Sequence, residues 1–379
     1  MTLSSEGMDE KPRPVAASMG PVRKVLVTGF EPFGGHDRNI SQEVAQRFEA
    51  VNALTDPWTG EVFPLVCETA VLSVDAEGSM EVAQRLRKGD AWDAVLHLGL
   101  CERCDVPRLE RLARDALDMR IPDNAGRQER GASLDGGGDR GCWVDPTIWP
   151  IESFSHPYEL STNAGAFLCN ETYFRTLEAL SATNSGLPLP SPCLFVHLPH
   201  HSTMAVEAAF AFSLQCLAYL VRPYPPNTVH VVAGHLSMSN GHHVVTQRPV
   251  GDGDAGRWEY PGGKCEQGED WRQSLTRELD EELALSVQPR HLLGTWVRTI
   301  NSTHYAVHLA HCDWSRVPEA IRLRAHAAFQ LLDTEQTPAL NWAGRDGEMF
   351  AHIRELSHNQ VDASPSASIA KSSLMDRGT

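Results

Sequence analysis

The chain has 379 residues, of which 22% are charged and 41% hydrophobic, a globular composition that excludes a fibrous or wholly disordered protein. It has 33 Lys and Arg against 49 Asp and Glu, and the resulting net charge of −16 argues against binding duplex nucleic acid or anionic membranes. Residues 1–22 contain charges and prolines but no apolar segment, so we expect a disordered leader without a secretory signal. Apolar stretches fall well short of the roughly 20 residues of a membrane span, and a cytoplasmic protein is expected.

The cysteines give the same indication about the compartment. There are nine of them at irregular spacing, which predicts reduced thiols and not a disulfide framework. Cys101 and Cys104 form a CxxC, but no second CxxC accompanies them, so a metal or redox role is not expected.

The first half of the chain alternates strand-like and helix-like segments. This alternation predicts an α/β domain built on a largely parallel sheet. Short apolar runs predict buried strands at 24–28, 94–98 and 193–198, and apolar periodicity predicts helices at 41–50, 165–180 and 204–221.

A proline-rich segment, RPYPPNT at 222–228, interrupts these elements, because it can continue neither a helix nor a central strand. We place the domain boundary there, with a linker at 223–227. Strands at 229–234, at 243–247 and within 293–311 follow around one polar helix, which predicts a smaller α+β domain. His242 and His243 are expected at a polar hairpin edge, and the Ser-rich residues 358–379 as a disordered tail.

The polar helix carries an acidic cluster. In the sequence GGKCEQGEDWRQSLTRELDEELAL, residues 262–285, Glu278, Glu281 and Glu282 fall on one helix face. Like charges at this spacing destabilise a helix, and a hard divalent cation would compensate them. A solvated acidic face without function is the alternative.

This segment resembles the Nudix hydrolase box. Gly263, Glu269, Arg277, Glu278, Leu279, Glu281, Glu282 and Leu285 fall in register, and Ala284 stands where the family has Gly. The resemblance implies that Glu281, Glu282, the Gly262 carbonyl and Glu278 hold Mg²⁺ or Mn²⁺. Glu278 is alternatively the general base.

The same resemblance implies that Arg277 pairs with Glu269 and that Asn341 reads a purine base. The implied substrates are nucleoside phosphates, of the purine deoxynucleoside triphosphate type. A departure lies at 321–332, IRLRAHAAFQLL, which lacks the later carboxylate of many relatives.

A thiol and an imidazole occupy suggestive positions in the first domain. Cys169 lies near the start of a predicted helix, where the helix dipole favours the thiolate. His197, in FVHLP, follows a buried strand whose carboxyl end would present the imidazole above the sheet. A buried structural cysteine and a structural histidine are the alternatives.

Four segments in this domain resemble pyroglutamyl peptidase type I, a cysteine peptidase. They are VLVTGFEPFGGHDRNIS (25–41), LERLARDALDMRIPDN (109–124), AGAFLCN (164–170) and FVHLP (195–199). By this resemblance Cys169 is the nucleophile, His197 the general base and Glu110 the residue that orients the imidazole. Arg120 contributes to the oxyanion site, Phe30 and Phe33 enclose the pyroglutamyl ring, and Asn39 fixes their loop. Departures are GLCER at 99–103 and a glycine-rich segment, DGGGDRG, at 135–141.

Together these resemblances predict a three-layer α/β peptidase domain at 23–222 and a Nudix-like sandwich domain at 228–357. The expected protein is a bifunctional hydrolase acting on pyroglutamyl peptides and nucleoside phosphates. The alternative is that one domain is catalytic and the other senses a ligand or binds a partner.

Overall fold

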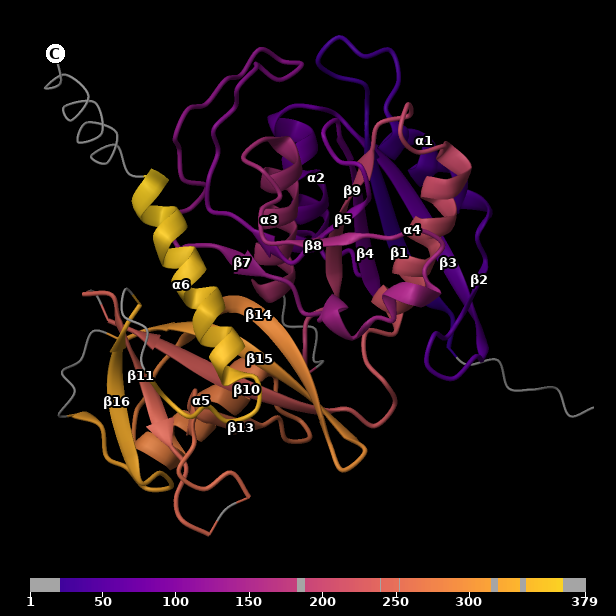
Figure 1. The fold of residues 1–379 in the computed structure, drawn as a ribbon. Helices are drawn as coiled ribbons and strands as arrows, with labels where there is room; N and C mark the ends of the chain where they lie inside the picture. Colours follow the sequence, from indigo (N-terminus) through magenta and orange to yellow (C-terminus); the bar gives the residue numbers. More distant parts are fainter. Residues whose placement is uncertain are drawn as a thin grey trace, which may run out of the picture.

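The structure is a computed structural model that describes residues 21–182, 188–238, 240–251, 253–314, 320–334 and 339–363, the last six without side chains. Most of the expected leader (1–22) and of the expected tail (358–379) therefore lies outside the described residues. Within them, no helix combines the length and apolarity needed to cross a membrane. The chain forms two adjoining domains (Figure 1).

The N-terminal domain is built on a seven-stranded sheet in the order β2-β3-β1-β4-β9-β5-β8. Neighbouring strands are parallel except β2–β3 and β5–β9, so the sheet is mostly parallel, as predicted. Its strands are β1 (Arg23–Phe30), β2 (Ala53–Thr55), β3 (Val62–Leu72), β4 (Ala94–Cys101), β5 (Arg108–Glu110), β8 (Glu159–Ser161) and β9 (Cys193–Pro199). A separate small ribbon pairs β6 (Leu112–Ala113) with β7 (Arg140–Gly141).

Helices cover both faces of this sheet and complete the predicted three layers. Helix α1 packs against α4, and α2 against α3; Figure 1 places the two pairs on opposite faces. The four helices are α1 (Ile40–Arg47), α2 (Ala76–Arg87), α3 (Leu168–Ala182) and α4 (Val206–Val221). Helix α3 begins three residues later than predicted, because Gly165 has a φ of +85°, which a helix does not accommodate.

The C-terminal domain has a mixed, mostly antiparallel sheet with the order β12-β11-β10-β15-β14, to which β13 and β16 add at β10 and β11. Apolar side chains pack on both faces of this sheet. One cluster lies between the sheet and α5, and the other lies between the sheet and α6. The elements are β10 (Val229–Ser237), β11 (His242–Gln247), β12 (Trp258–Glu259), β13 (Gly262–Lys264), α5 (Trp271–Leu283), β14 (Pro289–Ile300), β15 (Thr303–Asp313), β16 (Ala328–Asp333) and α6 (Asp346–Ala363).

Two expectations for this domain need correction. His243 was expected at a polar hairpin edge, but it is fully buried, because β11 lies inside the sheet and pairs with β10, β12 and β16. Its Nε2 contacts the Tyr260 hydroxyl at 3.2 Å. The domain end expected at 357 falls inside α6, which continues to Ala363.

The domains also share a core, so the 222–228 segment does not separate them. Trp143, from the first domain, is 2% exposed and belongs to the apolar core of the second, with its ring 5.1 Å from that of Trp271. Asp145 accepts hydrogen bonds from Arg345 and from the backbone of Val297, both at 2.7 Å. The two domains therefore form one continuous structure.

Candidate functional site

The imidazole of His197 and the carboxylate of Glu110 meet above the sheet. Antiparallel pairing of β5 with β9 brings their strands together, and His197 Nδ1 lies 2.8 Å from Glu110 Oε1. Glu110 is 1% exposed and His197 is 9% exposed, so the pair is shielded from water. A carboxylate at this ring nitrogen fixes the orientation of the imidazole.

Cys169 completes the group from α3. It is the second residue of this helix and partly exposed, and its side chain interacts with His197 closely enough to raise the pKa of the imidazole. Tyr173, one turn further along α3, donates a hydrogen bond of 2.9 Å to the Glu110 carbonyl and so ties the helix to β5. Thiol, imidazole and carboxylate thus come from three elements held in register.

The electrostatics of this group favour a protonated imidazole. Burial lowers the pKa of His197, but hydrogen bonds to Cys169 and Glu110 and the charges of both outweigh burial and raise it to about 10. An imidazolium beside a thiol stabilises the thiolate, which is the nucleophilic form of cysteine.

Gly99 of β4 makes room for the thiol, and the sequence reasoning did not identify this residue. A Cβ at position 99 would lie 3.1 Å from Cys169 Sγ and 2.7 Å from the Phe195 ring. Its position directly opposite His197 in the β4–β9 ladder could be read only once the strands were paired. Any side chain at 99 would displace the Cys169 thiol or the Phe195 ring.

Phe30 and Phe33 border a small apolar pocket at the thiol, together with Phe167 and Asn39. Phe30 is 3% exposed at the end of β1, whereas Phe33 is partly exposed, with its ring 5.9 Å from that of Phe167. The pocket therefore presents aromatic side chains next to the Cys169 thiol.

Asn39 stabilises the loop that carries Phe33. Its Oδ1 caps α1 by accepting from the Ser41 backbone at 3.0 Å, and its Nδ2 donates to the Glu31 carbonyl at 3.1 Å. Arg120 is placed differently: its side chain is exposed, and the described residues include no hydrogen bond from its guanidinium to the thiol. Its neighbour Ile121 lies against Gly34 of the same loop.

The cysteine expectation needs one correction near this site. Cys101 and Cys104 form a disulfide, because the turn after β4 brings their Cα atoms to 5.5 Å, within the normal range for a bridge. The other seven cysteines are free thiols, as expected.

The acidic face of α5 forms a second candidate site. Arg277 binds Glu269 through Nε at 2.9 Å and Nη2 at 3.0 Å, the pairing that the resemblance implies. Its Nη1 also reaches Glu278 at 2.9 Å and Glu281 at 3.3 Å. One guanidinium therefore contacts three carboxylates and offsets part of the repulsion expected on this face.

Glu282 points away from Arg277 into the domain. Its Oε2 accepts a 3.0 Å hydrogen bond from the backbone N–H of Gly262, and burial raises its pKa to about 7. Two residues that the sequence reasoning missed, Glu259 and His326, lie on this side. His326 Nε2 is 3.2 Å from Glu259 Oε1 and 3.9 Å from Glu282 Oε1. His326 lies in the stretch that lacks the later carboxylate.

These residues fit a divalent cation in chemistry but not in their present arrangement. Carboxylate and carbonyl oxygens are suitable ligands for Mg²⁺ or Mn²⁺. A Cβ at Gly263 would lie within 2.4 Å of the Glu278 carboxylate, so this glycine admits the side chain. However, no three His, Cys, Asp or Glu side chains of the described residues converge as a metal site does. A cation would have to draw Glu278 and Glu281 away from Arg277.

Two further residues that the Nudix resemblance singled out, Ala284 and Asn341, lie outside the acidic face. Ala284, which stands at the family's glycine, has φ 56° and ψ 35°, a left-handed cap that glycine adopts more easily. Asn341 is exposed, and its carbonyl accepts a 2.8 Å bond from the Trp258 backbone N–H. Its side chain is accessible to solvent.

Comparison with known proteins assigns each domain separately. A family model described as pyroglutamyl peptidase matches residues 23–218, and one described as NUDIX domain matches residues 228–361. Both resemblances seen in the sequence are therefore confirmed.

Individual relatives cover the first domain. The pyrrolidone-carboxylate peptidase of Pyrococcus furiosus is 32% identical over 181 residues, 47% of this chain and 81% of that protein. The Thermococcus litoralis protein of the same name is 28% identical over 193 residues, 50% of this chain and 82% of its own length. The crystal structure of pyrrolidone carboxyl peptidase from Fervidobacterium islandicum is 28% identical, with a TM-score of 0.45 over 53% of this chain and 99% of that one.

Proposed function

This chain belongs to the pyroglutamyl peptidase family, and on that premise we propose that its first domain removes N-terminal pyroglutamate from peptides. The observation that carries the proposal is the placement of Cys169 and Glu110 beside His197, with a 2.8 Å contact between Glu110 and the imidazole and the pKa of His197 raised to about 10. A nucleophile, an acid–base group and an orienting carboxylate are the parts required for acyl transfer through a covalent intermediate.

In the proposed mechanism the Cys169 thiolate attacks the carbonyl carbon of the pyroglutamyl residue. The tetrahedral intermediate collapses when the C–N bond breaks and His197 gives its proton to the leaving amine. A thioester remains, and His197 then takes a proton from water, which attacks the thioester and releases pyroglutamate. Glu110 stabilises the imidazolium whenever it forms.

The oxyanion of each tetrahedral intermediate needs hydrogen-bond donors. Cys169 lies in the first turn of α3, where backbone N–H groups have no partner within the helix. We propose that these N–H groups bind the oxyanion and that Arg120 assists after its exposed loop moves toward the substrate.

Substrate selection is proposed to reside in the pocket next to the thiol. The pyroglutamyl ring is flat and uncharged, with two apolar faces and one hydrogen-bonding edge. Phe30 and Phe33 supply aromatic surfaces of the required kind, and Asn39 keeps the Phe33 loop in place.

For the NUDIX domain we propose metal-dependent hydrolysis of a substrate that contains a nucleoside diphosphate linkage. Within this class we propose purine deoxynucleoside triphosphates. The acidic face of α5 and the Gly262 carbonyl would hold Mg²⁺ or Mn²⁺, which supplies charge neutralisation and an activated water. Glu278, partly buried beside Gly263, is proposed as the base or a further ligand, and the exposed Asn341 side chain as the group that reads the purine.

A second candidate for this domain is a ligand-sensing role without turnover. The observation that favours it is the hold of Arg277 on both Glu278 and Glu281, which leaves the carboxylates unassembled for a metal. In that case the peptidase domain alone is catalytic.

One panel of assays on the whole protein tests both proposals. Release of a fluorophore from a pyroglutamyl amide, but not from a prolyl amide, is expected without added metal. Hydrolysis of one or more deoxynucleoside triphosphates is expected with Mg²⁺ and not with a chelator. Absence of the first activity would refute the peptidase proposal, and absence of the second would leave the sensing role for the NUDIX domain.

A further inference from the structure

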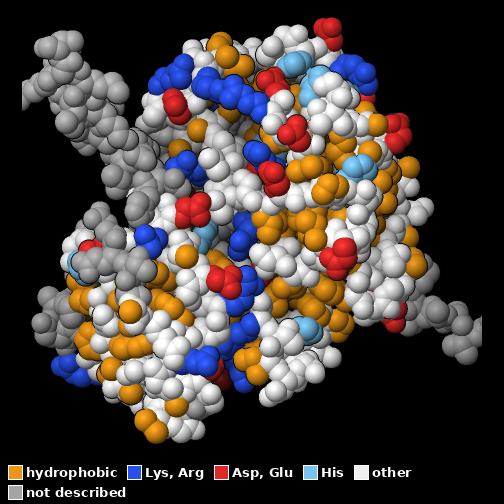
Figure 2. Space-filling view, in the orientation of Figure 1, with side chains coloured by type: hydrophobic (Ala, Val, Ile, Leu, Met, Phe, Trp, Pro, Cys, Tyr) orange, Lys and Arg blue, Asp and Glu red, His pale blue; other side chains and the backbone are white. Residues whose placement is uncertain are grey.

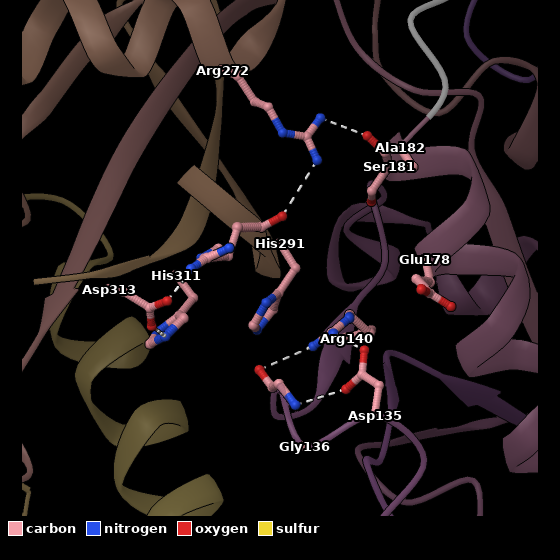
Figure 3. Close-up of a pocket in the computed structure, with 12 residues that line it drawn as sticks. Asp135, Gly136, Arg140, Glu178, Ser181, Ala182, Arg272, His291, His311 and Asp313 are labelled. Carbon is pink, nitrogen blue, oxygen red and sulfur yellow. Dashed lines mark hydrogen bonds and ion pairs between the residues drawn. The ribbon is translucent and has the colours of Figure 1, made fainter. Parts of the chain in front are cut away.

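The domain junction contains a cavity that belongs to neither candidate site. Its volume is about 490 Å³, and it is lined by residues of both domains, including the glycine-rich segment at 135–141 (Figure 3). Neither the residues of the thiol site nor Glu278, Glu281 and Glu282 line it. Its size suits a small-molecule ligand.

Arginines from three elements face this cavity. Arg140 comes from β7 of the peptidase domain, and Arg272 and Arg290 come from α5 and β14 of the NUDIX domain. Arg140 and Arg272 are held in place, Arg140 by Asp135 at 2.6 Å and Arg272 by the Ser181 carbonyl of the opposite domain. Figure 2 shows Lys and Arg side chains gathered along this boundary.

The acidic residues of the lining are already compensated. Asp135 pairs with Arg140, and Asp313 pairs with Arg290 at 2.7 Å. Glu178 is bound by two arginines outside the cavity, Arg87 at 3.1 Å and Arg175 at 3.8 Å. Arg272 is left without a carboxylate partner among the described residues, because its guanidinium donates to the Ser181 and Arg290 carbonyls.

His291 is the residue that points to a ligand. It is 5% exposed and lines the cavity, and no hydrogen-bond partner for its imidazole is found among the described residues. Figure 3 shows its ring directed into the cavity toward Arg140. Its ring nitrogens are not among the buried unsatisfied atoms of the described residues, so they are accessible from the cavity to a ligand.

The surroundings of His291 favour an anion over a cation. Burial and then Arg140, His311, Arg290 and Arg272 hold the pKa of His291 well below its usual range, so the field at the ring is positive. His235, His291 and His311 lie near one another, yet no three such side chains of the described residues form a metal-holding group.

We propose that this cavity binds an oxyanion of the phosphate class, either free phosphate or pyrophosphate or the phosphate group of a nucleotide. His291 and Arg290 contact it from the NUDIX domain, and Arg140 contacts it from the peptidase domain. Guanidinium groups match phosphate oxygens in geometry and charge. Because both domains supply contacts, the bound anion connects them.

The test is calorimetric titration of the full-length protein with inorganic phosphate and with pyrophosphate, in excess chelator so that the metal-dependent site is not loaded. The test variants are His291→Gln and Arg290→Gln; Arg290 is exposed, so its loss does not endanger folding. Matched controls are His304→Gln, at the far end of the β14–β15 hairpin, and Arg47→Gln on α1.

Each test variant is expected to weaken phosphate binding about tenfold or more, as loss of a hydrogen bond to a charged group does, and each control to leave it unchanged. Tighter binding of adenosine 5′-monophosphate than of phosphate would assign the cavity to a nucleotide, and equal binding to the free ion. The proposal is overturned by an absence of binding, by equal losses in test and control variants, or by pyroglutamate binding as tightly as phosphate. None of these outcomes depends on the proposed catalytic activities.

Discussion

The thiol site and the acidic face of α5 contain similar numbers of charged groups but differ in how these groups are organised. At the thiol site, Glu110 contacts His197 at 2.8 Å, Cys169 also acts on the imidazole, and each of the three comes from a different element. On α5, Arg277 binds two of the three carboxylates proposed for the metal, Glu278 and Glu281. The groups of the first site are therefore held by the fold, whereas those of the second are held by an ion pair that a cation would have to break.

The difference follows from how each site is built. The thiol site depends on strand pairing, which sets the distance between Glu110 and His197 through the backbone. The acidic face depends on flexible glutamates of one helix, which take the nearest opposite charge. Preorganised groups cost no rearrangement during reaction, whereas ligands that must leave an ion pair do.

The largest expected effect concerns the thiol site, the preorganised one of the two. Cys169→Ala should lower kcat/KM for a pyroglutamyl amide by about 10³-fold or more, because the nucleophile of a coupled triad is lost. Cys67→Ala is the matched control, a free thiol of the same domain whose pKa burial raises to about 12. Wild-type rates in Cys169→Ala would remove Cys169 from the mechanism.

Trp143→Ala tests whether the two domains that carry these sites share a core. Trp143 is buried in the core of the NUDIX domain although it belongs to the peptidase half of the chain. Its truncation should reduce the unfolding free energy by about 3–5 kcal/mol, the usual cost for a buried Trp. Scanning calorimetry would report this as a lower melting temperature of the NUDIX domain; a change within error would mean that the domains do not share a core.

Addition of Mg²⁺ sharpens the contrast at α5. The melting temperature of the NUDIX domain should rise. The free energy of unfolding should increase by about 2.7 kcal/mol when free metal is a hundred times its dissociation constant. Glu282→Gln should reduce this response, and Glu266→Gln, on the exposed loop before α5, should keep it. A flat response in the wild type would identify the acidic face as a solvated surface.

The smallest expected effect concerns pH at the thiol site. With the pKa of His197 raised to about 10, the imidazole is protonated below that pH and loses its proton above it, so kcat/KM should fall near pH 10. Glu110→Gln removes a group that stabilises the protonated form. The alkaline limb should therefore move to lower pH by about one unit, equivalent to about 1.4 kcal/mol.

The control for this profile is Glu159→Gln, an exposed carboxylate on the adjacent strand β8. It should leave the alkaline limb in place. An alkaline limb that does not move in Glu110→Gln would show that Glu110 does not act on His197.

Elements with a clear apolar pattern could be predicted from the sequence. Strands β1, β4 and β9 are continuous apolar runs, and α3 and α4 have long apolar faces. Strand β3 was missed, because it contains Pro64 and Glu68 and is only partly buried. Helix α2 was missed because its short apolar face is interrupted by Gly78 and Ser79.

The site residues also fall into those that a local sequence pattern predicts and those that only the tertiary structure places. Cys169, His197 and Glu110 could be chosen from local segments, because each lies within a recognisable motif. The place of Gly99, opposite His197, depends on strand register, and the place of His326, near Glu259 and Glu282, depends on tertiary packing. The cavity at the domain junction could not be predicted, because residues from distant parts of the chain form it.

The most direct test of the central claim is the rate at which each free cysteine is alkylated in the metal-free protein, followed by peptide mass spectrometry together with residual pyroglutamyl-amide hydrolysis. Cys169 should react fastest, because it is partly exposed and lies beside the His197 imidazole, and activity should disappear in step with its modification. Cys67 and Cys265, whose pKa values burial raises to about 12 and about 11, should react slowly. If hydrolysis persists after Cys169 is fully alkylated, or Cys169 reacts no faster than Cys67, the account of a preorganised thiol site is wrong.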